Sequence, residues 1–121
     1  ARAIARRFDE ALRPVDLRNG QFSLLISLNR PEPPTLGSVA QLLEMDRTTL
    51  TAALKVLERR GLTASLPHPN DARARRLRLT DAGRALLKSA VPVWRATHDI
   101  VDAGLAPVAP DTLREGLRRI A

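Results

Sequence analysis

The sequence contains no cysteine and very few aromatic residues. Without cysteine, it offers no disulfide framework, no thiolate zinc site and no thiol-based redox sensor. Because it has two Phe, one Trp and no Tyr, its core has to be built mainly from aliphatic side chains. The 121 residues are the length of one domain, so we expect a single domain over residues 1–121.

Long hydrophobic runs and catalytic motifs are also missing. No apolar run approaches the roughly 20 residues that a membrane-spanning helix needs, and no signal peptide opens the sequence, so we expect a cytoplasmic protein that does not act at a membrane. His68 and His98 lie far apart and in no metal-ligand pattern. There is no Gly-rich phosphate loop, nucleophile motif or carboxylate pair placed for acid–base chemistry. We therefore expect neither an enzyme nor a metal or other cofactor.

Positive charge, by contrast, is plentiful and concentrated. The chain has 20 basic and 13 acidic residues, a formal net charge of +7. Residues 47–88 hold ten of the basic and three of the acidic residues, so this segment carries the whole excess. A concentrated basic face is typical of a protein that binds a polyanion. The alternative is a solvated surface in an arginine-rich protein, since 18 of the 20 basic residues are arginine.

The spacing of apolar residues predicts helices over 1–13, 21–29, 37–44 and 47–60. Thr35-Leu36 reads as a short extended link and Met45-Asp46 as a tight turn, with Asp46 as the N-cap of the helix that follows. Gly61 follows the helix over 47–60 at the position where a glycine in the left-handed conformation commonly ends a helix. Residues 62–66 and 75–79 alternate as short strands do, on either side of a turn-rich loop.

Thr80-Asp81 predicts the start of a long helix over 81–103, kinked at Pro92 and followed by a break over 104–110 and a last helix over 111–120. The whole order predicts a mainly α fold with a small β-hairpin wing, that is, a winged helix-turn-helix with terminal dimerisation helices. We expect the winged lobe over 30–88 and the dimerisation helices over 1–20 and 95–121.

The face of helix 47–60 opposite its leucines predicts a DNA-binding surface. Small polar residues at its N-terminal end can approach base edges, and Lys55 and Arg59 can reach phosphates or guanine. The hairpin places arginines at its tip and returning strand, which suits a minor groove. The alternatives are an ordinary solvent-exposed helix face and a charged loop with no partner. The candidate DNA-binding residues are Ser38, Arg47, Thr48, Thr49, Thr51, Ala52, Lys55, Arg73, Arg75 and Arg76.

Residues 35–87 resemble the MarR family of bacterial transcriptional regulators. Thr35–Leu43 resembles the first helix of that family's motif, and Asp46–Thr51, running to Leu57–Leu62, resembles its recognition helix. The wing signature is matched by Asp71-x-Arg73-x-x-x-Leu77-x-Leu79-Thr80-x-x-Gly83. The flanking helices match in pattern rather than in motif.

The resemblance implies a homodimer that binds double-stranded DNA at a palindromic operator. It implies that the recognition helix enters the major groove and that Arg73 enters the minor groove. It also implies a small, often aromatic or phenolic, effector, whereas the cysteine-based sensing of some members does not carry over to this sequence. Apolar residues on the short terminal helices need a partner chain to cover them: Phe8, Leu12, Leu113, Leu117 and Ile120.

The few aromatic residues cluster on helices that can bound an effector pocket. Trp94 and His98 stand at i, i+4 on the long helix, so their rings can be neighbours; a packed helix face is the alternative. The candidate pocket residues are Phe8, Leu12, Phe22, Ile26, Trp94 and His98. Three hypotheses follow: a dimeric repressor released by a small ligand, a non-sensing accessory or architectural DNA-binding protein, and a winged-helix module for protein interaction.

Overall fold

Seven helical and strand elements and one 3₁₀ turn make up the part of the chain that the structure, a computed structural model, describes: residues 2–67, 69–70 and 75–105. They are α1 (Arg2–Leu12), the 3₁₀ turn η1 (Arg13–Val15), α2 (Asn19–Ser27), α3 (Leu36–Leu42), α4 (Arg47–Arg59), β1 (Thr63–Leu66), β2 (Arg76–Leu79) and α5 (Asp81–Leu105). The predicted fold class, mainly helical with a β-hairpin, is confirmed.

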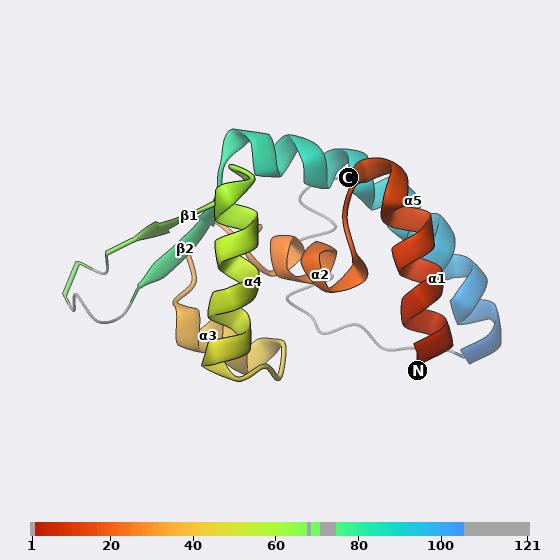
Figure 1. Ribbon diagram of the computed structural model, residues 1–121, viewed down its shortest axis with the longest axis horizontal. Coiled ribbons are helices and arrows are strands. Elements are labelled where there is room, and N and C mark those ends of the chain that lie inside the picture. The colour runs from red at the N-terminus through yellow and green to blue at the C-terminus, as the bar shows by residue number, and fades with distance from the viewer. Residues whose placement is uncertain (1, 68, 71–74, 106–121) are drawn as a thin grey trace.

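Local hydrogen bonds set the helix ends a few residues away from the predicted ones. α2 begins two residues early because the side chain of Gln21 accepts a hydrogen bond from the backbone N–H of Arg18 (2.9 Å). α5 continues through Leu105, so the predicted break at Gly104 is wrong for its first two residues. Pro92 lies inside α5, whose ribbon turns downward over its second half (Figure 1). The predicted helix over 111–120 lies outside the described residues.

The two strands pair antiparallel in the register Thr63↔Leu79 to Leu66↔Arg76. The predicted extended link joins them at Thr35, which bridges Arg76, whereas Leu36 already belongs to α3, so the link prediction is wrong for that residue. The Leu36 N–H donates to the carbonyl of Arg75 (3.0 Å), and the Leu77 N–H donates to that of Pro34 (2.8 Å). The hairpin is thus anchored to the start of α3. It extends away from the body of the molecule, beside α4, as Figure 1 shows.

One aliphatic core joins the elements. α2 lies at its centre and is buried over most of its length, and the core also takes in the inner faces of α4, β2 and α5. Its fully buried large side chains are Leu12, Leu24, Leu25, Ile26, Leu50, Leu57, Leu77 and Leu87. α1 packs against α5 at the side of the molecule away from the hairpin (Figure 1). The core therefore holds α3, α4 and the hairpin together as one lobe.

Two glycines are required by this packing. Gly61, after α4, has φ +76°, a left-handed conformation that glycine adopts without a steric penalty, as predicted. Gly83, in the first turn of α5, lies so close to β1 that a Cβ there would stand 2.0 Å from the carbonyl oxygen of Leu62. The glycine of the wing signature is thus explained by the contact between α5 and the start of the hairpin.

Candidate nucleic-acid interface

The turn between α3 and α4 fixes the angle between these helices. Glu44 lies in the left-handed region (φ 53°), and the Met45 N–H donates to the carbonyl of Ala40 (2.9 Å). The next residue, Asp46, caps α4: its Oδ1 accepts from the Thr49 N–H (2.7 Å) and its Oδ2 from the Thr49 hydroxyl (2.8 Å). Hydrogen bonding to Thr49 lowers the pKa of Asp46, so the carboxylate stays charged at the positive end of the helix.

α4 has one buried and one exposed face, as the sequence predicted. Leu50, Leu54 and Leu57 are buried in the core. The residues on the other side are exposed, namely Thr48, Thr49, Thr51, Ala52, Lys55 and Arg59. No acidic residue interrupts this face before Glu58, whose carboxylate accepts a hydrogen bond from the Ser65 hydroxyl. A surface of small polar side chains followed by cations therefore runs along the outside of α4.

Thr49 differs from its neighbours on this face. Although it is exposed, its hydroxyl donates to Asp46 and so takes part in the cap. The hydroxyl can still accept a hydrogen bond, but it is less free to turn toward a ligand than those of Thr48 and Thr51. Thr49 thus serves the structure of the helix end as well as its surface.

α3 brings two further candidates to the same end of α4. Ser38 is exposed in the first turn of α3, where its N–H donates to Thr35 Oγ1 (3.1 Å) and its hydroxyl to the Thr35 carbonyl (2.9 Å). The guanidinium of Arg47 lies against Gly37 of α3. Arg47 therefore bridges the two helices of the motif.

The two described wing arginines occupy different positions. Arg75, which precedes β2, is exposed and lines a cavity of about 320 Å³ between α4 and the hairpin, together with Thr51 and Lys55. Arg76 is half-buried on the next position of the strand. Of the two, Arg75 continues the exposed face of α4 onto the wing. Asp71 and Arg73 lie outside the described residues, so their placement at the tip stays a prediction.

The structure brings the candidate effector residues together, but as a packed cluster. The indole ring of Trp94 stacks on Phe22 (ring centroids 5.4 Å apart) and on His98 (4.7 Å), and it lies 5.8 Å from the ring of Phe8. Phe8, Phe22, Leu12 and Ile26 are all buried. The predicted neighbourhood of Trp94 and His98 is therefore present, while its use as a pocket stays a prediction.

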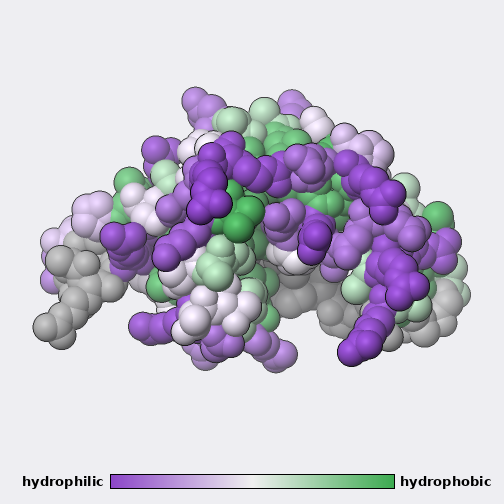
Figure 2. Space-filling view, viewed as in Figure 1, coloured by the Kyte–Doolittle hydropathy of each residue, from purple (hydrophilic) through white to green (hydrophobic). Residues whose placement is uncertain are grey.

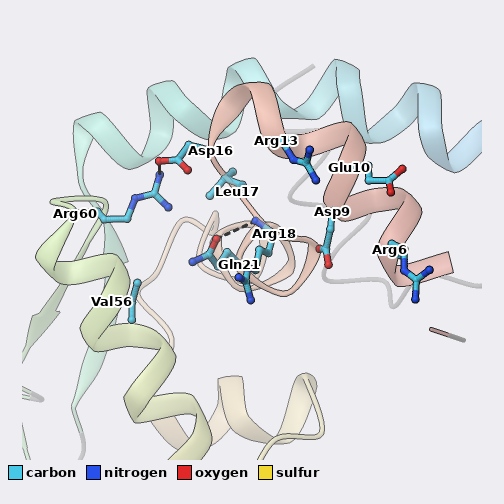
Figure 3. Close-up of a pocket in the computed structure, with 10 residues that line it drawn as sticks. All are labelled: Arg6, Asp9, Glu10, Arg13, Asp16, Leu17, Arg18, Gln21, Val56 and Arg60. Atoms are coloured by element: carbon cyan, nitrogen blue, oxygen red, sulfur yellow. Dashed lines mark hydrogen bonds and ion pairs between the residues drawn. The ribbon is translucent and has the colours of Figure 1, made fainter. Parts of the chain in front are cut away.

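One charged site was not anticipated from the sequence. Arg6, Asp9 and Glu10 of α1 and Arg13 of η1 line a cavity of about 610 Å³ that is bounded on the other side by α2 and the end of α4 (Figure 3). The sequence does contain a signal for this site, because the i, i+3, i+4, i+7 spacing of these four residues predicts a charged stripe on the side of the helix opposite Phe8 and Leu12. The facing residues on α4 could not be found in this way, because they are far away in the sequence.

Within the described ranges, the structure has no group of three or more His, Asp or Glu side chains that could hold a metal ion. No helix within those ranges is long and apolar enough to cross a membrane.

Comparison with known proteins agrees with this geometry. A family model described as "MarR family" matches residues 17–74. The transcriptional regulator BilQ of Clostridioides difficile is 34% identical over 79 residues, which are 65% of this chain and 53% of that protein. The multiple antibiotic resistance protein MarR of Escherichia coli K12 is 33% identical over 81 residues, or 67% and 56%. The chain thus spans about half the length of these curated relatives.

The solved structures give a match over nearly the whole chain. The transcriptional regulator MosR of Mycobacterium tuberculosis, in complex with DNA, is 37% identical, with a TM-score of 0.77. The match covers 98% of this chain and 85% of MosR. The likeness therefore includes α1 and α5 as well as the winged lobe.

Proposed function

This chain belongs to the MarR family, and from that premise we propose that it is a sequence-specific DNA-binding transcriptional regulator, a dimeric repressor that a small ligand releases from its operator. The relative MosR has been solved in complex with DNA. The observation that carries the proposal is the exposed, acid-free N-terminal part of α4, which is capped by Asp46 and whose first residue, Arg47, lies against Gly37 of α3.

The proposed contacts follow from the shape and chemistry of that face. Thr48, Thr51 and Ala52 are small enough to let the α4 backbone approach the base edges of a major groove, where their hydroxyl and methyl groups can read donors, acceptors and thymine methyls. Lys55 and Arg75 flank them as cations for the phosphates. Arg73 is proposed to enter the adjoining minor groove.

A two-fold dimer would present two such faces, and a palindromic operator would match them. Ile100, near the C-terminal end of α5, is 57% exposed in the protomer. An apolar side chain so open to water on a long helix fits a surface that a second copy covers. Leu113, Leu117 and Ile120 are proposed to extend that surface.

The aromatic cluster bears on ligand release in two ways. Phe8, Phe22, Trp94 and His98 can form a stacking surface for an aromatic effector if the cluster opens between protomers. In the protomer, however, ring spacings of 4.7–5.8 Å leave them packed on one another. That packing favours the second candidate function, a DNA-binding protein of the same fold that does not sense a ligand.

The experiment that tests DNA recognition is a mobility-shift titration with Thr48→Glu. A carboxylate at this position would face the phosphates and bases, so specific affinity should fall about 10- to 100-fold, without a change in melting temperature. Ala85→Glu is the matched control, because it adds the same charge at an exposed position of α5 and should leave affinity unchanged. Equal affinity of wild type and Thr48→Glu would remove α4 from the interface.

A further inference from the structure

The cavity of about 610 Å³ between α1, α2 and the end of α4 lies on the opposite side of α1 from the aromatic cluster. Arg6, Asp9 and Glu10 of α1 and Arg13 of η1 face it, whereas Phe8, on the other side of the helix, packs against Trp94 of α5. The remaining lining residues are Asp16, Leu17, Arg18, Gln21, Val56 and Arg60. This site is therefore separate from the aromatic pocket considered above.

The lining of the cavity is polar and excludes an apolar ligand. Leu17 and Val56 are the only apolar members among its ten residues. In Figure 2 the surface between α4 and α1 is largely coloured as hydrophilic, with a few hydrophobic patches between the polar residues. A ligand of this cavity has to be a polar, water-soluble molecule.

The cavity is lined by four arginines and three carboxylates, a net formal charge of +1. Two of the three carboxylates are already engaged: Asp9 accepts from the Asn19 N–H (2.7 Å) and Asp16 pairs with Arg60 (3.3 Å). Among the described residues, no ion pair joins the guanidinium groups of Arg6, Arg13 or Arg18 to a carboxylate. Three arginines that form no ion pair within the described ranges thus line the cavity, and they face two carboxylates outside the ion pair, Glu10 and Asp9, whose hydrogen bond to a neutral N–H leaves its charge in place.

The ion pair between Arg60 and Asp16 is weak enough for a bound anion to replace Asp16. The Asp16 side chain is 95% exposed and that of Arg60 28% exposed, and ion pairs this open to water contribute little to stability. Figure 3 shows Arg60 reaching from α4 toward Asp16 at one end of the cavity, with Arg6 of α1 and Arg13 of η1 on the opposite side. An anion in between can therefore replace Asp16 as the partner of Arg60 at small cost.

We propose that this cavity binds a small molecule with two or more anionic groups, carboxylate or phosphate, held between Arg60 on one side and Arg13 and its neighbours on the other. Planar guanidinium groups bind both kinds of anion through paired hydrogen bonds. The volume is that of a small-molecule site. Because Arg60 directly follows α4 as its C-cap residue, an occupied site would tie the end of that helix to α1.

Calorimetric titration of the DNA-free protein tests the site and does not depend on the proposed function. The probes are citrate, succinate and pyrophosphate at a fixed ionic strength set with sodium chloride. We expect saturable binding of one anion per protomer. If citrate binds more tightly than pyrophosphate, the ligand is a carboxylate, and if pyrophosphate binds more tightly, it is a phosphate. Arg13→Ala and Arg60→Ala should each weaken binding about tenfold. Asp16→Asn should strengthen it, because it frees Arg60, whereas Asp102→Asn on α5 should not.

Two control variants separate a built site from general attraction to a basic protein. Arg7→Ala removes the same charge from an exposed position of α1 outside the cavity, and Arg75→Ala removes it from the candidate DNA surface. Both should bind the anion as wild type does. The proposal is overturned if none of the three anions binds saturably, or if either control weakens binding as much as Arg13→Ala.

Discussion

Replacing Gly83 by alanine puts the packing of the wing against α5 to a quantitative test. Inside a helix, alanine is intrinsically better than glycine by about 1 kcal/mol, so propensity alone predicts a more stable protein. The structure predicts the opposite. The new Cβ would stand 2.0 Å from the Leu62 carbonyl oxygen and 2.9 Å from its carbon, where ordinary contact begins at 3.4 Å.

The size of the effect follows from that distance. The clash is with backbone, which cannot rotate away, so α5 and β1 would have to separate by about 1.4 Å at this point. This separation would also strain the hydrogen bond that the Thr80 N–H donates to the same Leu62 carbonyl (3.1 Å). Overpacking of this kind costs about 1–3 kcal/mol and sometimes more. A clash this close with backbone puts the cost at about 3 kcal/mol, and the helix propensity of alanine returns about 1 kcal/mol of it. We therefore expect a net loss of about 2 kcal/mol, or about 8 °C in melting temperature.

Gly20→Ala is the matched control for this experiment. Gly20 also lies in a helix, α2, but a Cβ there would have no atom outside its own helix within 4 Å. It should raise the melting temperature by about 2–4 °C, since only the propensity term acts. Melting followed by circular dichroism at one protein concentration decides between the two. A Gly83→Ala variant as stable as wild type, or more stable, would refute the argument from the contact with Leu62.

Three further outcomes are expected. In mobility-shift titrations, log affinity for DNA should fall steeply and linearly with log salt, because several phosphates lose counterions; a flat dependence would contradict an interface made by residues 47–88. The lowered pKa of Asp46 means that its stabilising effect is complete above the ordinary value of 3.8 and is lost as the pH falls through the lowered one. Acid should therefore destabilise wild type more than Asp46→Asn, and equal acid sensitivity would count against the cap. Sedimentation should give a dimer at micromolar concentration that Ile100→Lys weakens, whereas a stable wild-type monomer would disprove the dimer.

Local patterns in the sequence were enough to predict most of the fold. The period of Leu50, Leu54 and Leu57 predicted which face of α4 is buried, and so which threonines are exposed. Asp46 and Gly61 predicted both ends of that helix, because capping depends on a residue and its near neighbours. The pairing of the strands at 63–66 and 76–79 followed from alternation on either side of a turn-rich loop.

Features that depend on distant contacts could not be predicted in this way. The bridge of Thr35 to Arg76 joins segments 41 positions apart, and the ion pair of Asp16 with Arg60 spans 44. The left-handed Glu44 carried no signal, since glutamate has no special preference for that conformation. Only the hydrogen bond between the Thr49 hydroxyl and Asp46 shows that this hydroxyl belongs to the cap.

Selection of bound DNA from a random pool tests the central claim most directly. If α4 reads bases from two protomers related by a two-fold axis, the selected sequences should converge on an inverted repeat whose half-site centres lie about 10 base pairs, or a multiple of that, apart. The Thr48→Glu variant, carried through the same selection, should enrich nothing. A wild-type pool that stays random after repeated rounds, although the protein retains salt-sensitive binding to DNA, would contradict sequence-specific recognition by α4.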